Sequence, residues 1–526
     1  MKKGKAYLVG AGPGDPSLIT LRGLEVLKRA EVVIYDYLAG VRLLEYASQD
    51  AEFIYAGKKG GVHHTHTQEE INQMLIDRVR KGKRVVRLKG GDPFIYGRGG
   101  EELEVLSDAG LDFEAVPGVT SASAAATFAG IPITHRDYTS SVAYITGHEN
   151  PDKDKSRIDW ARISTGIGTL VFYMGIKNLA SITANLIKHG RAPETPVAVV
   201  RWASTPHQRS VVGTLADIAD IVIEEGIKPP ALTIVGDVVN LRHKINWYEI
   251  RPLFNRKIVV TRTRDKASEL VALLEEQGAN CLEFATIAIE PPDSWDEADK
   301  ALAGLDKYQW VLFTSLNAVD YFFKRLYDKG LDCRALKGCR VAAVGRVTAD
   351  RLKEYGLVCD LLPEKYTGEG LAAVLEKEGV KGDNILLPRA VKAREVLPDR
   401  LRLAGAAVTI VPVYQNVIPE GRNEFMKNKL LEKDIDMVTF TSSSTVTNFI
   451  NILGINDTGE LQRLMEGVKI AAIGPITAET VREMGLKVDV QPEKHTIPDM
   501  VRSIVSYYSA SCVSDSSEAK IAIKDI

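Results

Sequence analysis

The chain has 526 residues, more than one ordinary hydrophobic core contains, so we expect two to four domains. Apolar residues make up 45% of it and charged residues 26%, as in a soluble globular protein. The formal net charge of -2 leaves no overall basic field for nucleic acid or a membrane surface. Any anionic substrate therefore has to be met by local Arg and Lys side chains.

All five cysteines lie in the second half of the chain, and none has C-x-x-C spacing. This pattern argues against a zinc site or a disulfide framework and is typical of the reducing cytoplasm. The N-terminus enters a strand pattern without a signal peptide, and no apolar run approaches the roughly 18 residues of a membrane-spanning helix. We expect a soluble cytoplasmic protein without a metal ion.

Strand-like runs alternate with helical patterns along the chain, which predicts an α/β fold. The first elements are predicted as a strand at 6–9, a helix at 18–28 and a strand at 32–35. A further strand at 85–88 and a helix at 102–109 enclose a loop rich in glycine and charge. Open α/β sheets usually bind ligands at the carboxyl ends of their strands, so this loop is the first candidate site.

The loop interleaves glycines with Arg87, Lys89, Asp92, Arg98 and Glu101. Glycine lets a backbone approach a ligand closely and adopt positive φ. A plain turn needs only one or two glycines and gains nothing from this density of charge. The loop therefore indicates a binding site for a polar ligand.

A second glycine-rich segment, Val9–Pro16, follows the first strand and partly resembles a dinucleotide fingerprint. Pro13 and Pro16 interrupt it where the helix should begin, and the third glycine of G-x-G-x-x-G is absent. The segment therefore argues against NAD or FAD, although its glycines beside Asp15 still indicate close contact with a ligand.

The composition changes near residues 247–256, and a new strand begins at Lys257. We place a domain boundary there, with domains at 1–250 and 251–508. Ser-rich and charged residues at 509–526 predict a disordered tail.

The second domain contains an internal repeat of about 127 to 129 residues. The matching segments are Lys257–Arg264 with Asn384–Ala390, Val311–Val319 with Val438–Val446, and Val341–Asp350 with Ile470–Glu479. Two similar α/β lobes with a cleft between them follow from such a repeat. The copies need not coincide with the lobes, because strands can be exchanged between them.

The first domain resembles the tetrapyrrole methylases, and within them the uroporphyrinogen-III C-methyltransferases. The resemblance spans about residues 4–245 and rests on GAGPGDP from Gly10, YDYL from Tyr35, GGDPFIYGRGGEE from Gly90, PGVTSA from Pro117, GIPITHR from Gly130, FYMG from Phe172 and PAL from Pro230. It implies two α/β lobes, usually in a homodimer, that transfer two methyl groups from S-adenosylmethionine to C2 and C7 of uroporphyrinogen III. The product would be precorrin-2.

Carried over by motif, the cofactor-binding residues are Pro13, Gly90, Gly91, Asp92, Ile95, Thr120, Ser121 and Met174, with Ala203 and Ala231 as weaker candidates. The family often has V-E-x-G-T where this chain has Val200-R-W-A-S-T, which puts the contact at Ala203 in doubt.

The resemblance assigns Asp36 as proton acceptor and Lys58 as proton donor, although Lys58 is equally well explained as a solvated loop lysine. A pyrrole carbon that attacks a sulfonium methyl loses a proton afterwards, and a carboxylate such as Asp36 or Glu101 suits that step. The substrate of the family carries eight carboxylates, so Arg98 and Arg136 are expected to bind them. Lys89 and the histidines at 63–66 are secondary basic groups, and a polar loop explains these histidines better than a metal site.

The second domain has no nucleophile triad, metal cluster or phosphate loop, but hydroxyl side chains recur where strands turn into helices, at Ser315, Thr348, 441–445 and Thr477. Each of them can cap the following helix, and helix N-termini with hydroxyls also bind anions.

Residues 255–508 resemble uroporphyrinogen-III synthase through FTSLNAV from Phe313, AVGRVTA from Ala343, YTGEGL from Tyr366, FTSSSTV from Phe440 and AIGPITA from Ala472. The implied reaction cyclises hydroxymethylbilane with inversion of ring D. Tyr414 matches the family's candidate acid, and a core tyrosine explains it equally well. Ser315, Thr348, Ser443 and Thr477 are expected to bind substrate carboxylates.

The sequence thus predicts a bifunctional enzyme that makes uroporphyrinogen III and methylates it to precorrin-2, for sirohaem or cobalamin-type pathways. The alternative is a methylase for another substrate, fused to a module that senses tetrapyrroles without turnover.

Overall fold

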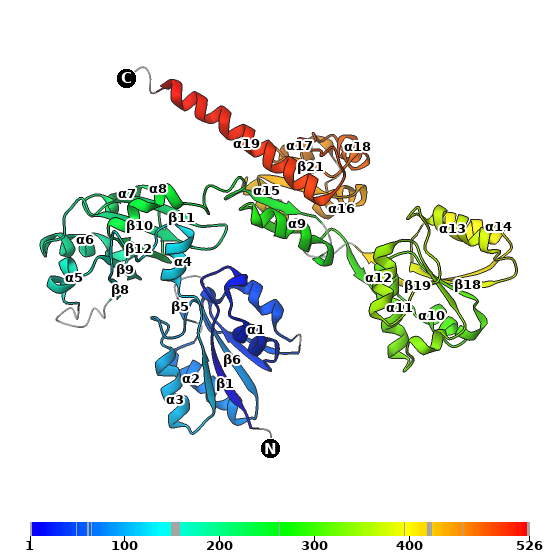
Figure 1. The fold of residues 1–526 in the computed structure, drawn as a ribbon, viewed down its shortest axis with the longest axis horizontal. Coiled ribbons are helices and arrows are strands. Elements are labelled where there is room, and N and C mark those ends of the chain that lie inside the picture. The colour runs from blue at the N-terminus through cyan, green and yellow to red at the C-terminus, as the bar shows by residue number, and fades with distance from the viewer. Residues whose placement is uncertain are drawn as a thin grey trace. The chain divides into compact units, whose positions relative to one another are not determined.

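The computed structural model describes residues 3–48, 50–59, 63–64, 66–148, 158–261, 264–393, 395–417, 423–455 and 457–522 (Figure 1). The chain divides into two compact units. Unit 1 comprises Met1–Lys257, Leu273–Asn280 and Val505–Ile526, and unit 2 comprises Ile258–Ala272 and Cys281–Ile504. The α/β prediction is confirmed in both units. The domain boundary itself stays a prediction.

Unit 1 begins with a lobe built on a parallel sheet of order β3-β2-β6-β1-β7. Its strands are β1 (Lys5–Gly10), β2 (Val32–Tyr35), β3 (Glu52–Tyr55), β6 (Arg84–Lys89) and β7 (Phe113–Val116). Helices α2 (Gln68–Arg80) and α3 (Gly99–Asp108) cover one face, and α1 (Leu21–Lys28) covers the other (Figure 1). Strands β4 (Lys58–Lys59) and β5 (His63–His64) form a separate two-stranded antiparallel sheet.

The second lobe of unit 1 has a mixed sheet of order β11-β10-β12-β9-β8. Its strands are β8 (Val142–Thr146), β9 (Thr169–Tyr173), β10 (Pro196–Arg201), β11 (Arg209–Thr214) and β12 (Ala231–Val235). Helix α4 (Ser121–Phe128) packs on one face, while α6 (Leu179–Lys188) and α7 (Ile218–Glu224) pack on the other. The remaining helices are α5 (Trp160–Gly166) and α8 (Arg242–Ile245).

Unit 2 contains two sheets, of order β14-β13-β20-β21 and β15-β19-β18-β16-β17. The first contains β13 (Lys257–Val260), β14 (Asn280–Glu283), β20 (Met437–Phe440) and β21 (Lys469–Ala472). The second contains β15 (Ala288–Glu290), β16 (Trp310–Phe313), β17 (Arg340–Ala343), β18 (Asn384–Ala390) and β19 (Ala407–Val417). The helices of unit 2 are α10 (Asp296–Leu302), α11 (Leu316–Asp328), α12 (Arg346–Glu354), α13 (Gly368–Glu378), α14 (Val396–Leu403), α15 (Asn423–Leu431), α16 (Ser443–Leu453), α17 (Thr458–Leu464) and α18 (Pro475–Glu483). Helices α9 (Arg264–Glu276) and α19 (Ile497–Ala522) are divided between the units, because Leu273–Asn280 and Val505–Ile526 belong to unit 1.

The two sheets of unit 2 are built by strand exchange between the sequence repeats. Strand β13 of the first copy pairs with β20 of the second copy, and β18 of the second copy pairs with β16 of the first. The orders β14-β13-β20-β21 and β19-β18-β16-β17 therefore correspond strand for strand. The repeat explains why the two lobes have the same topology although neither is one continuous copy.

Several predicted boundaries differ from the structure. Helix α1 begins at Leu21 rather than at residue 18, because the Thr20 side chain accepts a hydrogen bond from the Gly23 N–H and caps the helix there. Helix α3 begins at Gly99, three residues before the predicted start. Helix α19 extends over much of the segment predicted as a disordered tail, and residues 523–526 lie outside the described part, so the mobility of this end stays a prediction.

The prediction that hydroxyl side chains cap the helices of unit 2 is only partly right. Ser315 caps α11 and Ser442 caps α16. Thr348 and Thr477 do not cap: they are buried inside the first turn of α12 and α18, whose N-cap residues are glycines, at 345 and 474. These two threonines therefore belong to the packed side of their helices.

Candidate active sites

Three loops meet at the carboxyl end of the first sheet of unit 1, after β1, β6 and β7. The Gly91 N–H donates to the carbonyl of Gly12 at 2.7 Å, and the Gly12 N–H donates back to the carbonyl of Gly91 at 3.2 Å. A Cβ atom on Gly10 would lie 2.5 Å from Cα of Gly118 and 2.7 Å from the Gly91 carbonyl oxygen. Only glycine permits this approach, so the three loops form one closely packed surface, here called the glycine floor.

Gly90 and Asp92 complete the glycine floor. A Cβ atom on Gly90 would lie 2.5 Å from Cβ of Leu38, so this position also excludes a side chain. The Asp92 carboxylate accepts hydrogen bonds from the N–H groups of Phe94 at 2.8 Å and Gly118 at 3.0 Å. Because both of its oxygens are bonded within the loops, Asp92 fixes the shape of the floor. Its direct contact with a cofactor stays a prediction.

The segment after Asp92 reaches from the first lobe to the second. Ile95 packs against the core of the second lobe, and the Tyr96 hydroxyl donates to the Tyr144 carbonyl at 2.7 Å. The Tyr96 ring lies 4.8 Å from that of Tyr173. Tyr96 and Arg98 have φ of 55° and 59°, an unusual conformation for residues other than glycine. Such backbone strain is concentrated at functional sites.

Arg98 and Glu101 form an exposed pair beyond this segment. Arg98 Nη2 lies 2.6 Å from Glu101 Oε2, and Nε lies 3.1 Å from both carboxylate oxygens. Hydrogen bonding raises the pKa of Arg98 and lowers that of Glu101. Arg136 is exposed, and the side chain of Lys58 lies outside the described part. A substrate carboxylate at Arg98 would therefore compete with Glu101.

Asp36 caps the short helix Tyr37–Ala39 directly after β2. Its Oδ1 accepts from the Leu38 N–H at 3.1 Å, and its Oδ2 lies 3.4 Å from Nη2 of Arg87. The Asp36 side chain keeps 27% of its surface exposed, whereas that of Arg87 keeps 5%. Asp36 is thus a fixed carboxylate with one side open to a ligand and the other held by a buried guanidinium.

A buried charge cluster lies behind Asp36. The fully buried Glu102 accepts through Oε1 from Lys89 at 2.9 Å, Gln68 at 3.0 Å and Arg87 at 3.4 Å, and its Oε2 has no partner among the described residues. Burial, followed by the charge of Arg87, lowers the pKa of Lys89. Lys89 is 5% exposed, so contact with a substrate carboxylate would require this cluster to open. Glu102, the centre of the cluster, was not predicted from the sequence.

The second lobe contributes the start of α4 and the end of β9. Thr120 is the N-cap residue of α4, and its Oγ1 lies 2.7 Å from the Tyr173 hydroxyl. A Cβ on Gly91 would lie 3.7 Å from the Ser121 nitrogen, which places the first turn of α4 against the glycine floor. Met174 follows β9 with φ of 55° and is 53% exposed. The structure therefore brings these predicted cofactor residues of both lobes together.

The segment at Ala203, which departs from the family pattern, lies against the loop that carries Pro13. Pro13 is followed by Gly14, where a Cβ would lie 2.5 Å from Cγ2 of Thr205. The Asp15 N–H donates to Oγ of Ser204 at 3.3 Å. The two loops predicted to contact the cofactor, one from each lobe, thus touch each other.

Trp202 is a residue of this site that was not predicted from the sequence. Its ring lies 5.8 Å from that of Tyr37, next to Asp36, in an edge-on arrangement. Trp202 and Ser204 have φ of 53° and 67°. Ala231, the weaker cofactor candidate, begins β12 and pairs with Arg201, which precedes Trp202. The sequence could have indicated Trp202, because it is an aromatic residue inside the Val200-R-W-A-S-T segment that was already considered for cofactor contact.

In unit 2 the Tyr414 hydroxyl lies 3.2 Å from Oγ of Ser315, with either atom as donor. Tyr414 is 8% exposed, and its ring lies 6.0 Å from that of Tyr321. Ser315 also accepts from the Ala318 N–H at 3.1 Å as the cap of α11. The structure thus joins one predicted acid and one predicted substrate group at the end of β16.

The other predicted carboxylate-binding hydroxyls are less clearly placed for a ligand. Thr348 and Thr477 are 6% and 5% exposed. Ser443 is half-buried and accepts from the Thr480 hydroxyl at 2.9 Å. Of these three residues, Ser443 is the one that a substrate could reach without a change in helix packing.

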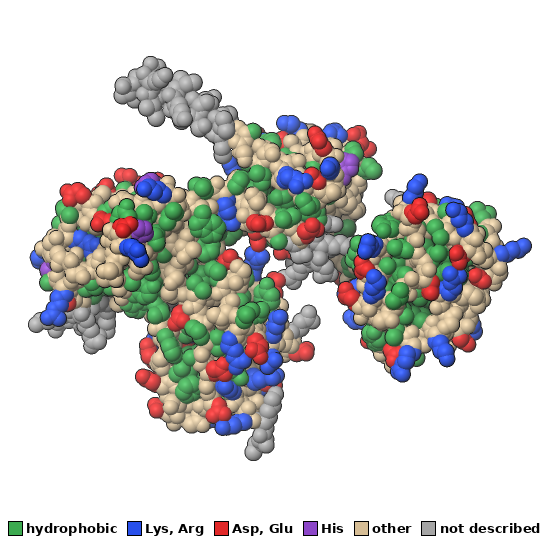
Figure 2. Space-filling model, in the orientation of Figure 1, with side chains coloured by type: hydrophobic (Ala, Val, Ile, Leu, Met, Phe, Trp, Pro, Cys, Tyr) green, Lys and Arg blue, Asp and Glu red, His purple; other side chains and the backbone are tan. Residues whose placement is uncertain are grey.

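The described residues contain no group of three or more His, Cys, Asp or Glu placed to hold a metal ion. His66 lies 3.6 Å from Glu70, and the side chains of His63 and His64 lie outside the described part. No helix in the described ranges is long and apolar enough to cross a membrane. Acidic and basic side chains are intermixed on the visible surface of each part (Figure 2).

Two family models match the chain: tetrapyrrole (corrin/porphyrin) methylases at residues 5–219, and uroporphyrinogen-III synthase HemD at residues 268–502. A porphyrin biosynthesis protein HemD of Ruminiclostridium josui is 38% identical, over 96% of this chain and 98% of that protein. A uroporphyrinogen-III C-methyltransferase of Bacillus subtilis is 36% identical, over 86% of this chain and 88% of that protein.

Among solved structures, a uroporphyrin-III C-methyl transferase of Thermus thermophilus complexed with S-adenyl homocysteine is 41% identical, covering 45% of this chain and 99% of that one with a TM-score of 0.39. The two relatives that match along most of their length share both halves with this chain, in the same order. The chain therefore belongs to the family of porphyrin-biosynthesis proteins in which a tetrapyrrole methylase is followed by a uroporphyrinogen-III synthase.

Proposed function

We propose that the chain cyclises hydroxymethylbilane to uroporphyrinogen III and then methylates this product at C2 and C7 to give precorrin-2. The observation that carries the methylase assignment is the glycine floor, which brings the backbone of three loops to one place beside Asp36. The relatives with matching architecture support the synthase assignment. Precorrin-2 would then serve sirohaem or cobalamin-type pathways.

The residues of the glycine floor fit S-adenosylmethionine as the methyl donor. Side-chain-free backbone at Gly91 lies against the first turn of α4, where Ser121 begins the helix. The exposed Met174 follows Tyr173, whose hydroxyl is hydrogen-bonded to Thr120 at the N-cap of this helix. Backbone amides and an exposed thioether suit a ligand with both polar and apolar parts. The cofactor supplies an electrophilic methyl group on its sulfonium.

The residues around the floor suit the macrocycle. The exposed side of the Asp36 carboxylate would accept the proton that the pyrrole carbon loses after methylation. Arg98 and Arg136, both exposed, would bind substrate carboxylates, in the first case after displacing Glu101. Trp202 and Tyr37 offer aromatic edges beside Asp36 on which the flat pyrroles would pack.

In the synthase half we propose that Tyr414 donates a proton to the hydroxyl group that leaves the bilane. The electrophilic azafulvene that remains is attacked within the same molecule, so preorganisation of the chain ends supplies much of the catalysis. The hydrogen bond between Tyr414 and Ser315 would hold the phenol in position, and the proton that the pyrroles lose as the ring closes would restore the phenol.

Replacing Tyr414 by phenylalanine is expected to slow cyclisation by roughly 10²-fold or more, because the ring and its packing remain while the acid is lost. The rate of formation of the type III isomer, measured against the spontaneous type I isomer, checks this. Tyr321→Phe is the matched control, since its hydroxyl donates to the Ile289 carbonyl instead. Full cyclisation rate in Tyr414→Phe would remove the tyrosine from the role of acid.

The whole proposal is tested by supplying hydroxymethylbilane and S-adenosylmethionine to the full chain. We expect the absorption spectrum of precorrin-2, and uroporphyrinogen III when the methyl donor is omitted. The type I isomer alone would contradict the synthase assignment and favour a sensing module. Uroporphyrinogen III without methylated product would contradict the methylase assignment.

We further propose that the methylase half forms a homodimer, as the resemblance implies, and that the protein is cytoplasmic. Among the residues that the structure describes, Cys281, Cys333, Cys339 and Cys359 form no disulfide, which agrees with a reducing compartment. Light scattering on the purified full chain checks the dimer, and a monomeric mass at micromolar concentration would refute it.

A further inference from the structure

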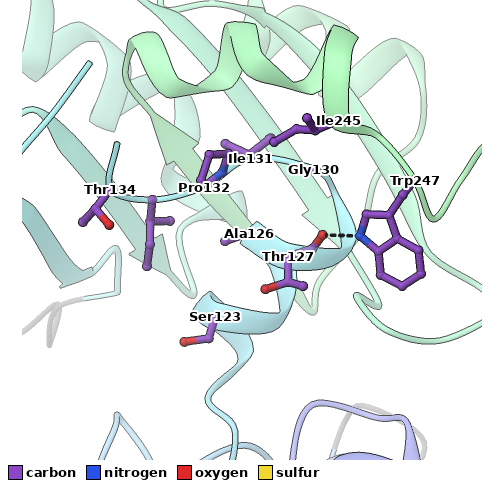
Figure 3. Close-up of a pocket in the computed structure, with 10 residues that line it drawn as sticks. Ser123, Ala126, Thr127, Gly130, Ile131, Pro132, Thr134, Ile245 and Trp247 are labelled. Atoms are coloured by element: carbon purple, nitrogen blue, oxygen red, sulfur yellow. Dashed lines mark hydrogen bonds between the residues drawn. The ribbon is translucent and has the colours of Figure 1, made fainter. Parts of the chain in front are cut away.

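The segment from Arg242 to Glu249, which leads out of the methylase half, is bonded to the far end of α4. The Trp247 Nε1–H donates to the carbonyl of Thr127 at 3.0 Å (Figure 3), and Arg242 Nη1 donates to the carbonyl of Ala129 at 2.5 Å. The packing between α4 and this segment is incomplete, because a cavity of about 440 Å³ opens beside Trp247. The rings of Trp247 and Tyr248 also pack on that of Phe128, at 5.4 and 4.8 Å, so hydrogen bonds and ring packing together hold the segment on α4.

The same segment is bonded to the loop that carries Ala203. Glu249 Oε1 accepts from Gln208 Nε2 at 2.7 Å and from Ser210 Oγ at 2.6 Å, while Oε2 is paired with Arg242. Gln208 is fully buried, and its Oε1 accepts from the Ser204 N–H at 3.0 Å. Glu249 is itself 13% exposed at the side chain, so this is an internal network rather than a surface ion pair.

The network ends on strained backbone of the proposed cofactor site. Trp202 and Ser204 both have positive φ, which persists only where the surroundings hold it. Gln208 holds the Ser204 N–H, and the Ser204 hydroxyl in turn accepts from the Asp15 N–H in the loop after β1. A continuous route of hydrogen bonds thus leads from Glu249 to both loops that flank the proposed cofactor site.

We propose that Glu249 is a positioning residue for the cofactor site and acts on it through Gln208 and the loop at Ser204. This inference rests on the proposed methyl transfer. It makes the connection between the two halves part of the methylase machinery: the segment that leads to the synthase half also sets the shape of the cofactor pocket.

The test measures binding of S-adenosylhomocysteine to the full-length protein by calorimetry. Glu249→Ala is expected to raise the Kd about tenfold, because a charged hydrogen-bond acceptor is removed from buried partners. Glu249→Gln keeps an oxygen for Gln208 and Ser210 and is expected to recover most of the affinity. In a Gln208→Leu background, Glu249→Ala is expected to add less than about twofold, since the route is already broken.

Glu225→Gln is the matched control. Glu225 pairs with the exposed Arg209, which lies on the same strand as Ser210, but this ion pair does not contact the loop at Ser204. Cyclisation of hydroxymethylbilane by the same samples reports folding of the synthase half and is expected to be unchanged. Three outcomes would overturn the inference. The Kd of Glu249→Ala could lie within twofold of wild type, the substitution could have the same effect with and without Gln208, or cyclisation could be lost in parallel. Failure of the wild-type chain to bind S-adenosylhomocysteine would instead refute the proposed function.

Discussion

Replacing Asp36 by asparagine is expected to lower the kcat of methyl transfer by roughly 10²- to 10⁴-fold, the usual contribution of a general base. Asparagine keeps an oxygen that accepts from the Leu38 N–H, so the cap of the short helix is retained, although the ion pair with Arg87 is lost. It loses the carboxylate that accepts the proton. Turnover of uroporphyrinogen III with S-adenosylmethionine, followed by the formation of methylated product, measures the effect.

Asp332→Asn is the control for this substitution. Asp332 caps a short helix in the other unit in the same way, accepting from the Arg334 N–H at 2.9 Å. We expect its methyl transfer to equal that of the wild type. Binding of S-adenosylhomocysteine should be unchanged in Asp36→Asn, because Asp36 lies outside the glycine floor. A kcat within threefold of wild type would show that another group removes the proton.

The sequence was most informative where a loop has to exclude side chains. At Gly10 and Gly90 an added Cβ would lie 2.5 Å from atoms of another loop, and Gly91 has a φ of +69° that favours glycine. The resemblance to the tetrapyrrole methylases implied that loops of both lobes contact one cofactor, and two of these loops touch at Asp15 and Ser204. Local chemistry was sufficient to predict close approach at the glycines, whereas the second prediction depended on the resemblance.

The supporting contacts could not be predicted in the same way, because they join residues far apart in the chain. In the sequence, Glu102 resembles any acidic residue in the first turn of a helix. In the structure it is buried and accepts hydrogen bonds from Lys89 and Arg87. Gln208 and Glu249 are polar residues without any distinguishing spacing. The roles of these residues depend on which helices, strands and loops pack together. Secondary-structure propensity and the periodicity of apolar residues do not contain this information.

In unit 2 the long-range arrangement could be predicted from the sequence, whereas some local details could not. The repeat predicted two lobes of equal topology and left open an exchange of strands, which the pairing of β13 with β20 and of β18 with β16 confirms. The capping prediction went wrong at Thr348 and Thr477, because glycines earlier in each turn already occupy the N-cap. The hydroxyl residues correctly marked the start of each helix, but they lie in its first turn rather than at the N-cap position.

Replacing Gly10 by alanine is expected to weaken binding of S-adenosylmethionine by about 10²-fold or more and to abolish methyl transfer. The new Cβ would lie 2.5 Å from Gly118 and 2.7 Å from the Gly91 carbonyl, all of it backbone that cannot rotate away. The loops after β1, β6 and β7 would have to separate, and a displacement of about 1 Å at such a site costs on the order of 10²-fold. Calorimetric titration with S-adenosylhomocysteine measures the loss.

Gly100→Ala is the matched substitution, because Gly100 lies in the same glycine-rich motif but a Cβ added there would meet no atom of another element within 4 Å. Since Gly100 lies in the first turn of α3, alanine there is expected to preserve cofactor binding and to favour the helix slightly. Cyclisation provides an internal measure of folding of the synthase half in both variants. If Gly10→Ala bound the cofactor within threefold of wild type, close backbone approach at the glycine floor would not be what forms the site.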